Sequence, residues 1–125
     1  MAKVDKFQGH LLPNIVFKES VFCKITHFDE LILCKISRFT IYYLNDRSGE
    51  CDFVVCKGNK VEQCIQVSYD ISAERTRKRE VNGLLLAARQ TKCENLLLLT
   101  DHESEQILQD GHTITVQPVY EWSLE

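Results

Sequence analysis

Residues 39–69 contain three short, largely apolar runs, a pattern that is typical of β-strands, and in the third run the polar residues Gln66 and Ser68 alternate with apolar ones. The runs, each rich in β-branched, aromatic or cysteine residues, span 39–44, 50–57 and 61–69. Turn-forming residues at 45–49 and 58–59 separate them. Connections this short predict an antiparallel meander of three strands.

After Ser72 the spacing of apolar residues changes to that of a helix. One side of the predicted helix carries Val81, Leu84, Leu85 and Ala88. Asp70 or Ser72 can cap its start, and Glu74 can pair with Lys78 one turn further on. Gly83 is a mild weakness inside it.

The remaining segments give a mixed α/β pattern. Residues 95–100 form a continuous apolar run, which predicts a strand that is covered on both faces. A short polar helix is expected over 103–108, then a last strand over 113–119, with Trp122 packing the end of the chain. Near the N-terminus a helix is expected over 15–21, whereas 23–37 fits helix and strand equally well.

Length and charge narrow the class of protein. The 125 residues suit a single domain over residues 1–125, with 44% hydrophobic and 26% charged residues. No apolar run approaches the roughly 20 residues of a membrane helix, and the N-terminus has no secretory apolar segment. We therefore expect a cytoplasmic protein without membrane contact. A net charge of −3 means that any nucleic-acid binding requires a local basic patch.

The cysteines do not predict a metal centre. The chain has six of them and four histidines, but no CxxC, CxxxC or HxxxH pair with the spacing of a zinc site. Without a secretory signal, reduced thiols that act as small buried hydrophobic residues are the better interpretation. These residues are Cys23, Cys34, Cys51, Cys56, Cys64 and Cys93.

A candidate site lies on the second and third predicted strands. Glu50 and Asp52 are two residues apart and so share one face, as do Gln66 and Ser68 on the next strand. Glu19, on the predicted first helix, could complete an oxygen-rich site of the kind that holds Mg²⁺. The alternative is that Glu50 and Asp52 belong to an ordinary solvated strand face and that Gln66 and Ser68 line a cavity.

The same residues resemble a known family. Residues 50–55, a short turn and the following strand resemble the PD-(D/E)XK nuclease-like core, in which an Asp and the (D/E) hold the metal and the Lys helps to activate water. Stretches along nearly the whole chain are similar to the C-terminal nuclease-like domain, of unknown function, of Bacteroides-type bacterial AAA-family ATPases. The stretches are 14–19, 41–43, 49–55, 66–70, 99–101 and 118–122. The resemblance implies a restriction-endonuclease-like core, for which we expect a central mixed sheet of four to five strands flanked by helices.

The chain also departs from the family pattern. At the (D/E)xK position it has Gln66 and Ser68, so both the metal-binding charge and the fixed positive charge are missing. Losing one such group typically costs about 10²–10³ in rate. Pro13 and the long stretch 20–37 also depart from the pattern around Glu19. Asp52, Gln66, Ser68 and Glu19 are therefore interpreted as relics of a catalytic site, and no metal or other cofactor is expected.

Three classes of function follow. The leading one is a catalytically inactive nuclease-fold module, detached or truncated from an ATPase, that binds nucleic acid or protein; no GxxxxGK[ST] motif for nucleotide is present. A basic run at the helix start could contact phosphates, or could be a solvated surface. It consists of Arg75, Arg77, Lys78 and Arg79. The alternatives are an active Mg²⁺-dependent nuclease with a rearranged site, and a protein-interaction or homodimerisation domain with an exposed edge strand.

Overall fold

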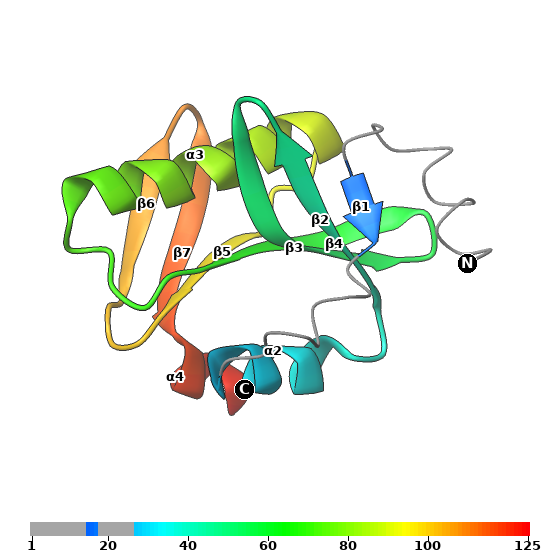
Figure 1. Cartoon of the computed structure of the whole chain (residues 1–125), viewed down its shortest axis with the longest axis horizontal. Coiled ribbons are helices and arrows are strands. Elements are labelled where there is room, and N and C mark those ends of the chain that lie inside the picture. The colour runs from blue at the N-terminus through cyan, green and yellow to red at the C-terminus, as the bar shows by residue number, and fades with distance from the viewer. Residues whose placement is uncertain (1–14, 18–26) are drawn as a thin grey trace.

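The computed structural model describes residues 15–17 and 27–125, which form one mixed sheet with helices on both faces (Figure 1). The predicted α/β class is thereby confirmed, but the described sheet has seven strands rather than four or five. Their order is β1-β2-β3-β4-β5-β7-β6. The two additional strands, β1 and β6, lie where the sequence pattern predicted helices.

The predicted meander is confirmed. It consists of β2 (Thr40–Asp46), β3 (Gly49–Lys57) and β4 (Lys60–Val67), each antiparallel to the next. The register between β2 and β3 is irregular at one point: Tyr42 lies opposite Val54, whereas Leu44 lies opposite Cys51. This bulge places two residues of β3, Asp52 and Phe53, opposite one residue of β2.

Helix α3 (Glu74–Thr91) carries the chain from β4 to the parallel strand β5 (Leu96–Thr100). Every residue of β5 is buried, as its apolar run predicted. The prediction of a side-chain cap on α3 was wrong: the N-cap residue is Ala73, which makes no such bond. The carboxylate of Asp70 instead accepts the backbone N–H of Ser72 (2.7 Å), because a two-residue Asx turn competes with the cap.

The helix expected over 103–108 is a strand, β6 (Glu105–Gln109). Asp110 and Gly111 both adopt positive φ, 53° and 80°, which is the geometry of a tight two-residue hairpin. That turn folds β6 antiparallel to β7 (His112–Pro118), and β7 in turn pairs parallel with β5. Tertiary pairing therefore overrode the weak local helical pattern.

At the other edge of the sheet, β1 (Ile15–Phe17) pairs antiparallel with β2. The helix predicted over 15–21 was thus wrong for its first three residues, because two of the three are β-branched and the edge of β2 offers backbone partners. Glu19 lies outside the described residues. The open alternative over 23–37 becomes helix α2 for His27–Ile36.

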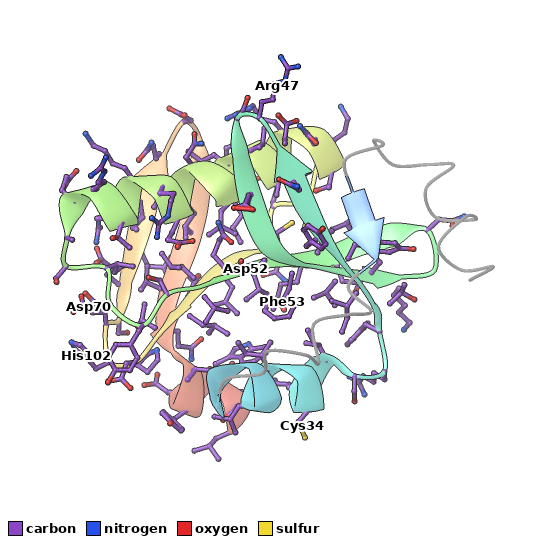
Figure 2. All side chains as sticks on the ribbon, in the orientation of Figure 1. Cys34, Arg47, Asp52, Phe53, Asp70 and His102 are labelled. Carbon is purple, nitrogen blue, oxygen red and sulfur yellow. The ribbon has the colours of Figure 1, made fainter. Side chains whose placement is uncertain are left out.

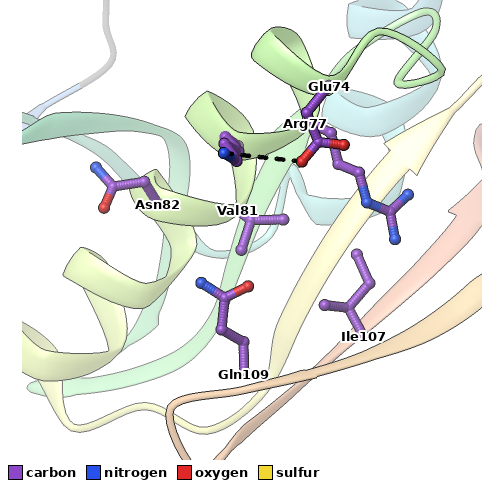
Figure 3. Close-up of a pocket in the computed structure, with 7 residues that line it drawn as sticks. Glu74, Arg77, Val81, Asn82, Ile107 and Gln109 are labelled. Atoms are coloured by element: carbon purple, nitrogen blue, oxygen red, sulfur yellow. Dashed lines mark ion pairs between the residues drawn. The ribbon is translucent and has the colours of Figure 1, made fainter.

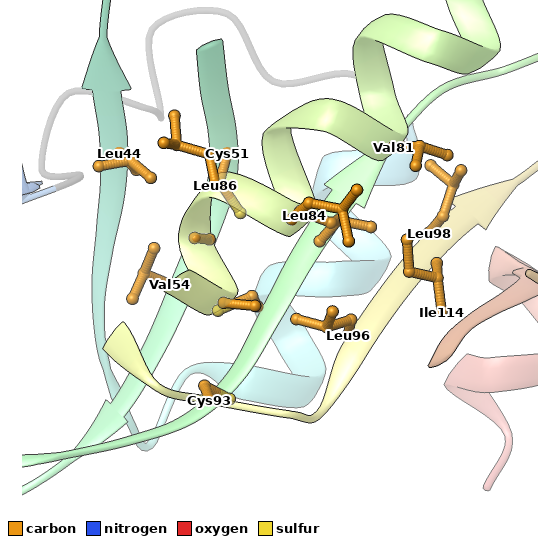
Figure 4. Packing of buried hydrophobic residues seen from close by; sticks show 14 of the residues in the cluster. Leu44, Cys51, Val54, Val81, Leu84, Leu86, Cys93, Leu96, Leu98 and Ile114 are labelled. Carbon is orange, nitrogen blue, oxygen red and sulfur yellow. The ribbon is translucent and has the colours of Figure 1, made fainter. Parts of the chain in front are cut away.

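Two hydrophobic clusters fill the two faces of the sheet. One lies under α3, and Figure 4 shows its packing, in which Leu84 and Leu98 are fully buried. The other joins the opposite face to α2 and α4 (Val119–Ser123), and includes Trp122, as predicted for the chain end. Lys35 of α2 lies 4.5 Å from the centre of the Trp122 ring and donates to the Trp122 carbonyl. No helix among the described residues has the length and apolar character required to cross a membrane.

Four cysteines are packing residues, as expected, whereas Cys34 is exposed and Cys23 lies outside the described residues. Cys51, Cys56, Cys64 and Cys93 are buried free thiols in the cluster under α3. Burial raises the pKa of Cys56 to about 12, and a hydrogen bond with Cys51 is the main cause that raises the pKa of Cys64. Such thiols are poor nucleophiles.

Candidate functional site

The predicted site lies where β3 and β4 diverge. The last pair of the ladder toward this end is Phe53 with Ile65, and beyond it the N–H of Ser68 bonds to the Leu99 carbonyl of β5 (2.9 Å). The strands therefore form a fork, with Asp52 on one arm and Gln66 on the other. Backbone groups inside a fork need other partners, since unpaired buried amides are costly.

Side chains supply those partners. The Asp52 Oδ2 accepts the backbone N–H of Val67 (2.9 Å), and the Gln66 Oε1 accepts the backbone N–H of Asp52 (2.8 Å). The thiol of Cys51 lies 3.6 Å from the Ile65 carbonyl. The two residues that the resemblance assigned to metal binding thus continue the β3–β4 ladder through their side chains.

Gln66 also ties the fork to α3. Its Nε2 donates to the carbonyls of Glu50 (2.7 Å) and Glu80 (3.2 Å), and only 2% of the residue is exposed. With both amide protons and the amide oxygen bonded to backbone atoms, Gln66 connects β3, β4 and α3. A carboxylate at this position would lack the two donors.

Gly83 makes this connection sterically feasible. A Cβ on Gly83 would lie 1.9 Å from the Glu50 carbonyl oxygen and 2.2 Å from Gln66 Nε2. The glycine that the sequence marked as a helix weakness is therefore the point where α3 lies directly against β3. Asn82 beside it donates to the Ser48 carbonyl (2.8 Å) and holds α3 against the β2–β3 hairpin.

An open cleft lies outside the fork, between the β2–β3 hairpin and α3, and Figure 2 shows Arg47 at the tip of that hairpin and Asp52 beneath α3. Glu50 and Asp52 both line this cleft, which agrees with the prediction that they share one face of the strand. Glu80 joins them from α3. Its side chain is 13% exposed, and burial, followed by the charge of Asp52, raises its pKa.

Sequence reasoning missed Glu80. The signal was present, because Glu80 lies one turn before Leu84 and two turns before Ala87, both fully buried, and so falls on the buried face of α3. A charged residue in that position is unusual unless it is paired, and Arg79 lies 3.4 Å from its carboxylate.

The residues at the former metal-binding positions of this cleft are engaged in other bonds. Gln66 carries no charge and its amide oxygen accepts the N–H of Asp52, while Asp52 uses one carboxylate oxygen for the Val67 amide. Ser68, half-buried, donates to the Asp70 carbonyl (3.3 Å) and provides no positive charge. Among residues 15–17 and 27–125, no three His, Cys, Asp or Glu side chains are grouped so as to hold a metal ion.

The predicted basic cluster is divided in two. Arg77 turns toward β6 and forms a two-pronged ion pair with Glu105 (2.7 and 2.8 Å). Arg75, Lys78 and Arg79 remain on the outer face of α3, all exposed. Lys78 lies 4.0 Å from Glu74, as the spacing predicted.

Comparisons with known proteins add no relative to this picture: neither the protein-family models, nor the curated proteins, nor the solved structures yield a match. The resemblance to the nuclease-like domains therefore depends on the quoted residues alone.

Proposed function

We propose that this chain is a non-catalytic module of the nuclease-like class, in which the former site has become part of the framework. The observation that supports the proposal is the bonding of Asp52 and Gln66 to backbone amides across the β3–β4 fork. A metal-dependent nuclease needs those oxygens for its cation and a cationic group near the attacking water. Here the oxygens stabilise the strand ends, and Ser68 stands in the place of the lysine.

The activity that we assign to the module is the binding of nucleic acid through its phosphates. Arg75, Lys78 and Arg79 project from one face of a rigid helix, with 77% and 70% of the Lys78 and Arg79 side chains exposed. Exposed cations on one face can neutralise several phosphates without reading sequence. An ATPase domain, in the same chain or separate, is the partner that the resemblance suggests.

The test combines cleavage and retention in the same samples. The protein is incubated with supercoiled plasmid and with single-stranded DNA in Mg²⁺, Mn²⁺ or EDTA, and retention is measured by gel shift across a salt series. We expect no cleavage and a retention that weakens with salt. Cleavage that requires metal and disappears in Asp52→Ala would instead indicate an active nuclease.

A matched control comes from the same helix. The variant Arg75→Gln/Lys78→Gln/Arg79→Gln should lose retention and reduce the slope of log K against log salt by up to about 3. Arg77→Gln removes one charge of the same type, but one that is already paired with Glu105, and should leave retention nearly unchanged. If the wild type is not retained even at low salt, the proposal of nucleic-acid binding fails and a protein partner is favoured.

A further inference from the structure

The edge strand β6 has the features of a strand that pairs with a second copy of itself. Among the described strands β6 pairs with β7 alone, in an unbroken register from Glu105 opposite Val116 to Gln109 opposite His112. Because Gln109 and His112 close a two-residue hairpin, they form a hydrogen-bonded pair, and so do Ile107 and Ile114. The backbone N–H and C=O groups of Gln106 and Leu108 consequently point away from β7, toward the open edge.

This edge lacks the usual protection against strand pairing. It contains no proline and no bulge, and its one charged residue, Glu105, is paired with Arg77 of the same chain. Leu108 is 79% exposed on one face of the strand. On the other face, Figure 3 shows Ile107 across a groove from Val81 of α3, with polar residues around them. The edge is therefore regular and partly apolar, and its single charge is paired within the chain.

The sequence of β6 is self-complementary in an antiparallel pair centred on Ile107. In that register the outward N–H and C=O groups of Gln106 bond to those of Leu108 in the second copy, and Leu108 bonds in the same way to Gln106 of the second copy. These two pairs give four hydrogen bonds. Ile107 meets its own copy at the two-fold axis, in the position where side chains approach most closely. Glu105 faces Gln109 of the second copy, so no like charges lie opposite each other. All five residues of the strand are paired.

We propose that the chain forms a two-fold homodimer through antiparallel pairing of β6 with β6 of a second copy, centred on Ile107. The sheet then continues across both molecules, and the axis is perpendicular to it. Both α3 helices consequently lie on the same face of the joined sheet. The dimer does not depend on the proposed nucleic-acid binding, although it would bring two basic α3 faces onto one side.

The first test uses a proline that removes an outward N–H. Sedimentation equilibrium over a concentration series should give twice the chain mass for the wild type. Leu108→Pro deletes a donor that only the second copy can use, so it should give the monomer mass with an unchanged circular dichroism spectrum. Leu108→Thr loses the same leucine but keeps the N–H, and should remain largely dimeric.

The second test checks the register by disulfide capture. In a background with Cys23→Ser and Cys34→Ser, the other cysteines being buried, Ile107→Cys should cross-link two chains under mild oxidation. Gln109→Cys, which faces position 105 of the second copy in this register, should not. A wild type that is monomeric at every concentration would overturn the proposal. So would a dimer that Leu108→Pro leaves intact or that Gln109→Cys cross-links as well as Ile107→Cys.

Discussion

The β3–β4 fork and the β6 edge both leave strand backbone groups without a neighbouring strand, but the chain treats them differently. At the fork, Asp52 and Gln66 bond to the backbone amides across the gap. At β6, the outward groups of Gln106 and Leu108 have no strand beside them in the described part of the chain. A polar side chain near a strand end should therefore first be tested as a partner of backbone groups. A catalytic role is the second hypothesis.

The largest loss of stability is expected from a substitution in α3 that disturbs the fork. Gly83→Ala places a methyl group against the Glu50 carbonyl and the Gln66 amide, so α3 must move away from β3. The gain in helix propensity, about 1 kcal/mol, is smaller than the cost of the clash. We expect a net loss of about 3 kcal/mol in the free energy of unfolding, measured by urea denaturation. Arg89→Ala, exposed on the same helix, is the control and should change the stability by less than about 0.5 kcal/mol.

The next effect removes the partners inside the fork. Gln66→Leu keeps the size of the side chain but leaves the Asp52 amide and two carbonyls without their bonds. We expect a loss of about 2–3 kcal/mol in urea denaturation. Gln66→Glu keeps an acceptor but loses both donors, and should also be destabilised. If Gln66→Glu were as stable as the wild type and bound Mg²⁺, the donor hydrogen bonds of Gln66 would not be needed to hold the strands, and the fork would be better described as a metal site.

A smaller loss of stability is expected when the ion pair between Arg77 and Glu105 is removed, because this pair lies at β6 and away from the fork. The Arg77 guanidinium lowers the pKa of Glu105, so the pair stabilises the fold above the usual pKa of a glutamate. This contribution is lost as the pH falls through the lowered pKa. Because the Arg77 and Glu105 side chains are 30% and 41% exposed and solvent screens the pair, Arg77→Gln should cost less than about 1 kcal/mol at neutral pH and nothing at strongly acid pH. A large loss that persists in acid would show that Arg77 acts through packing.

The smallest expected change concerns Glu80, whose raised pKa makes its charge unfavourable in the folded state. The wild type should therefore gain stability, relative to Glu80→Gln, as the pH falls through the raised pKa toward the usual glutamate value. At neutral pH Glu80→Gln should match or slightly exceed the wild type, since the lost contact with Arg79 is worth less than about 1 kcal/mol. Thermal unfolding across the pH range measures both. A strong destabilisation at neutral pH would give the Glu80 carboxylate a structural role.

The sequence predicted the elements whose pattern is strong. The meander, α3 and the buried strand β5 each have a clear period and an apolar face, so local pattern and tertiary packing agree. Strands β1 and β6 were predicted as helices, because five or fewer residues carry little periodicity and their pairing partners are distant or depend on a turn. The alternation that placed Glu50 near Asp52 was sound.

The bonding inside the site was beyond the sequence. Side-chain pattern indicates which residues share a face, but the divergence of β3 and β4 is a property of the whole sheet. From the sequence alone, Gln66 is interpreted as a lost metal ligand and Gly83 as a weak point in a helix. In the structure, the Gln66 side chain connects β3, β4 and α3, and the missing side chain of Gly83 leaves space for the Gln66 amide. Arg77 was likewise grouped with its neighbours in sequence, although it pairs with β6.

The most direct test of the closed fork is amide hydrogen exchange at Val67, followed by NMR. Its N–H bonds to the Asp52 carboxylate, whereas the next amide, Ser68, bonds to the Leu99 backbone and serves as an internal reference. We predict that Val67 is protected in the wild type. In Asp52→Ala its exchange should rise about tenfold or more relative to Ser68, the factor that corresponds to about 1.4 kcal/mol. Rapid exchange of Val67 in the wild type, equal to that in Asp52→Ala, would show that the carboxylate does not hold the Val67 amide and would contradict the closed fork.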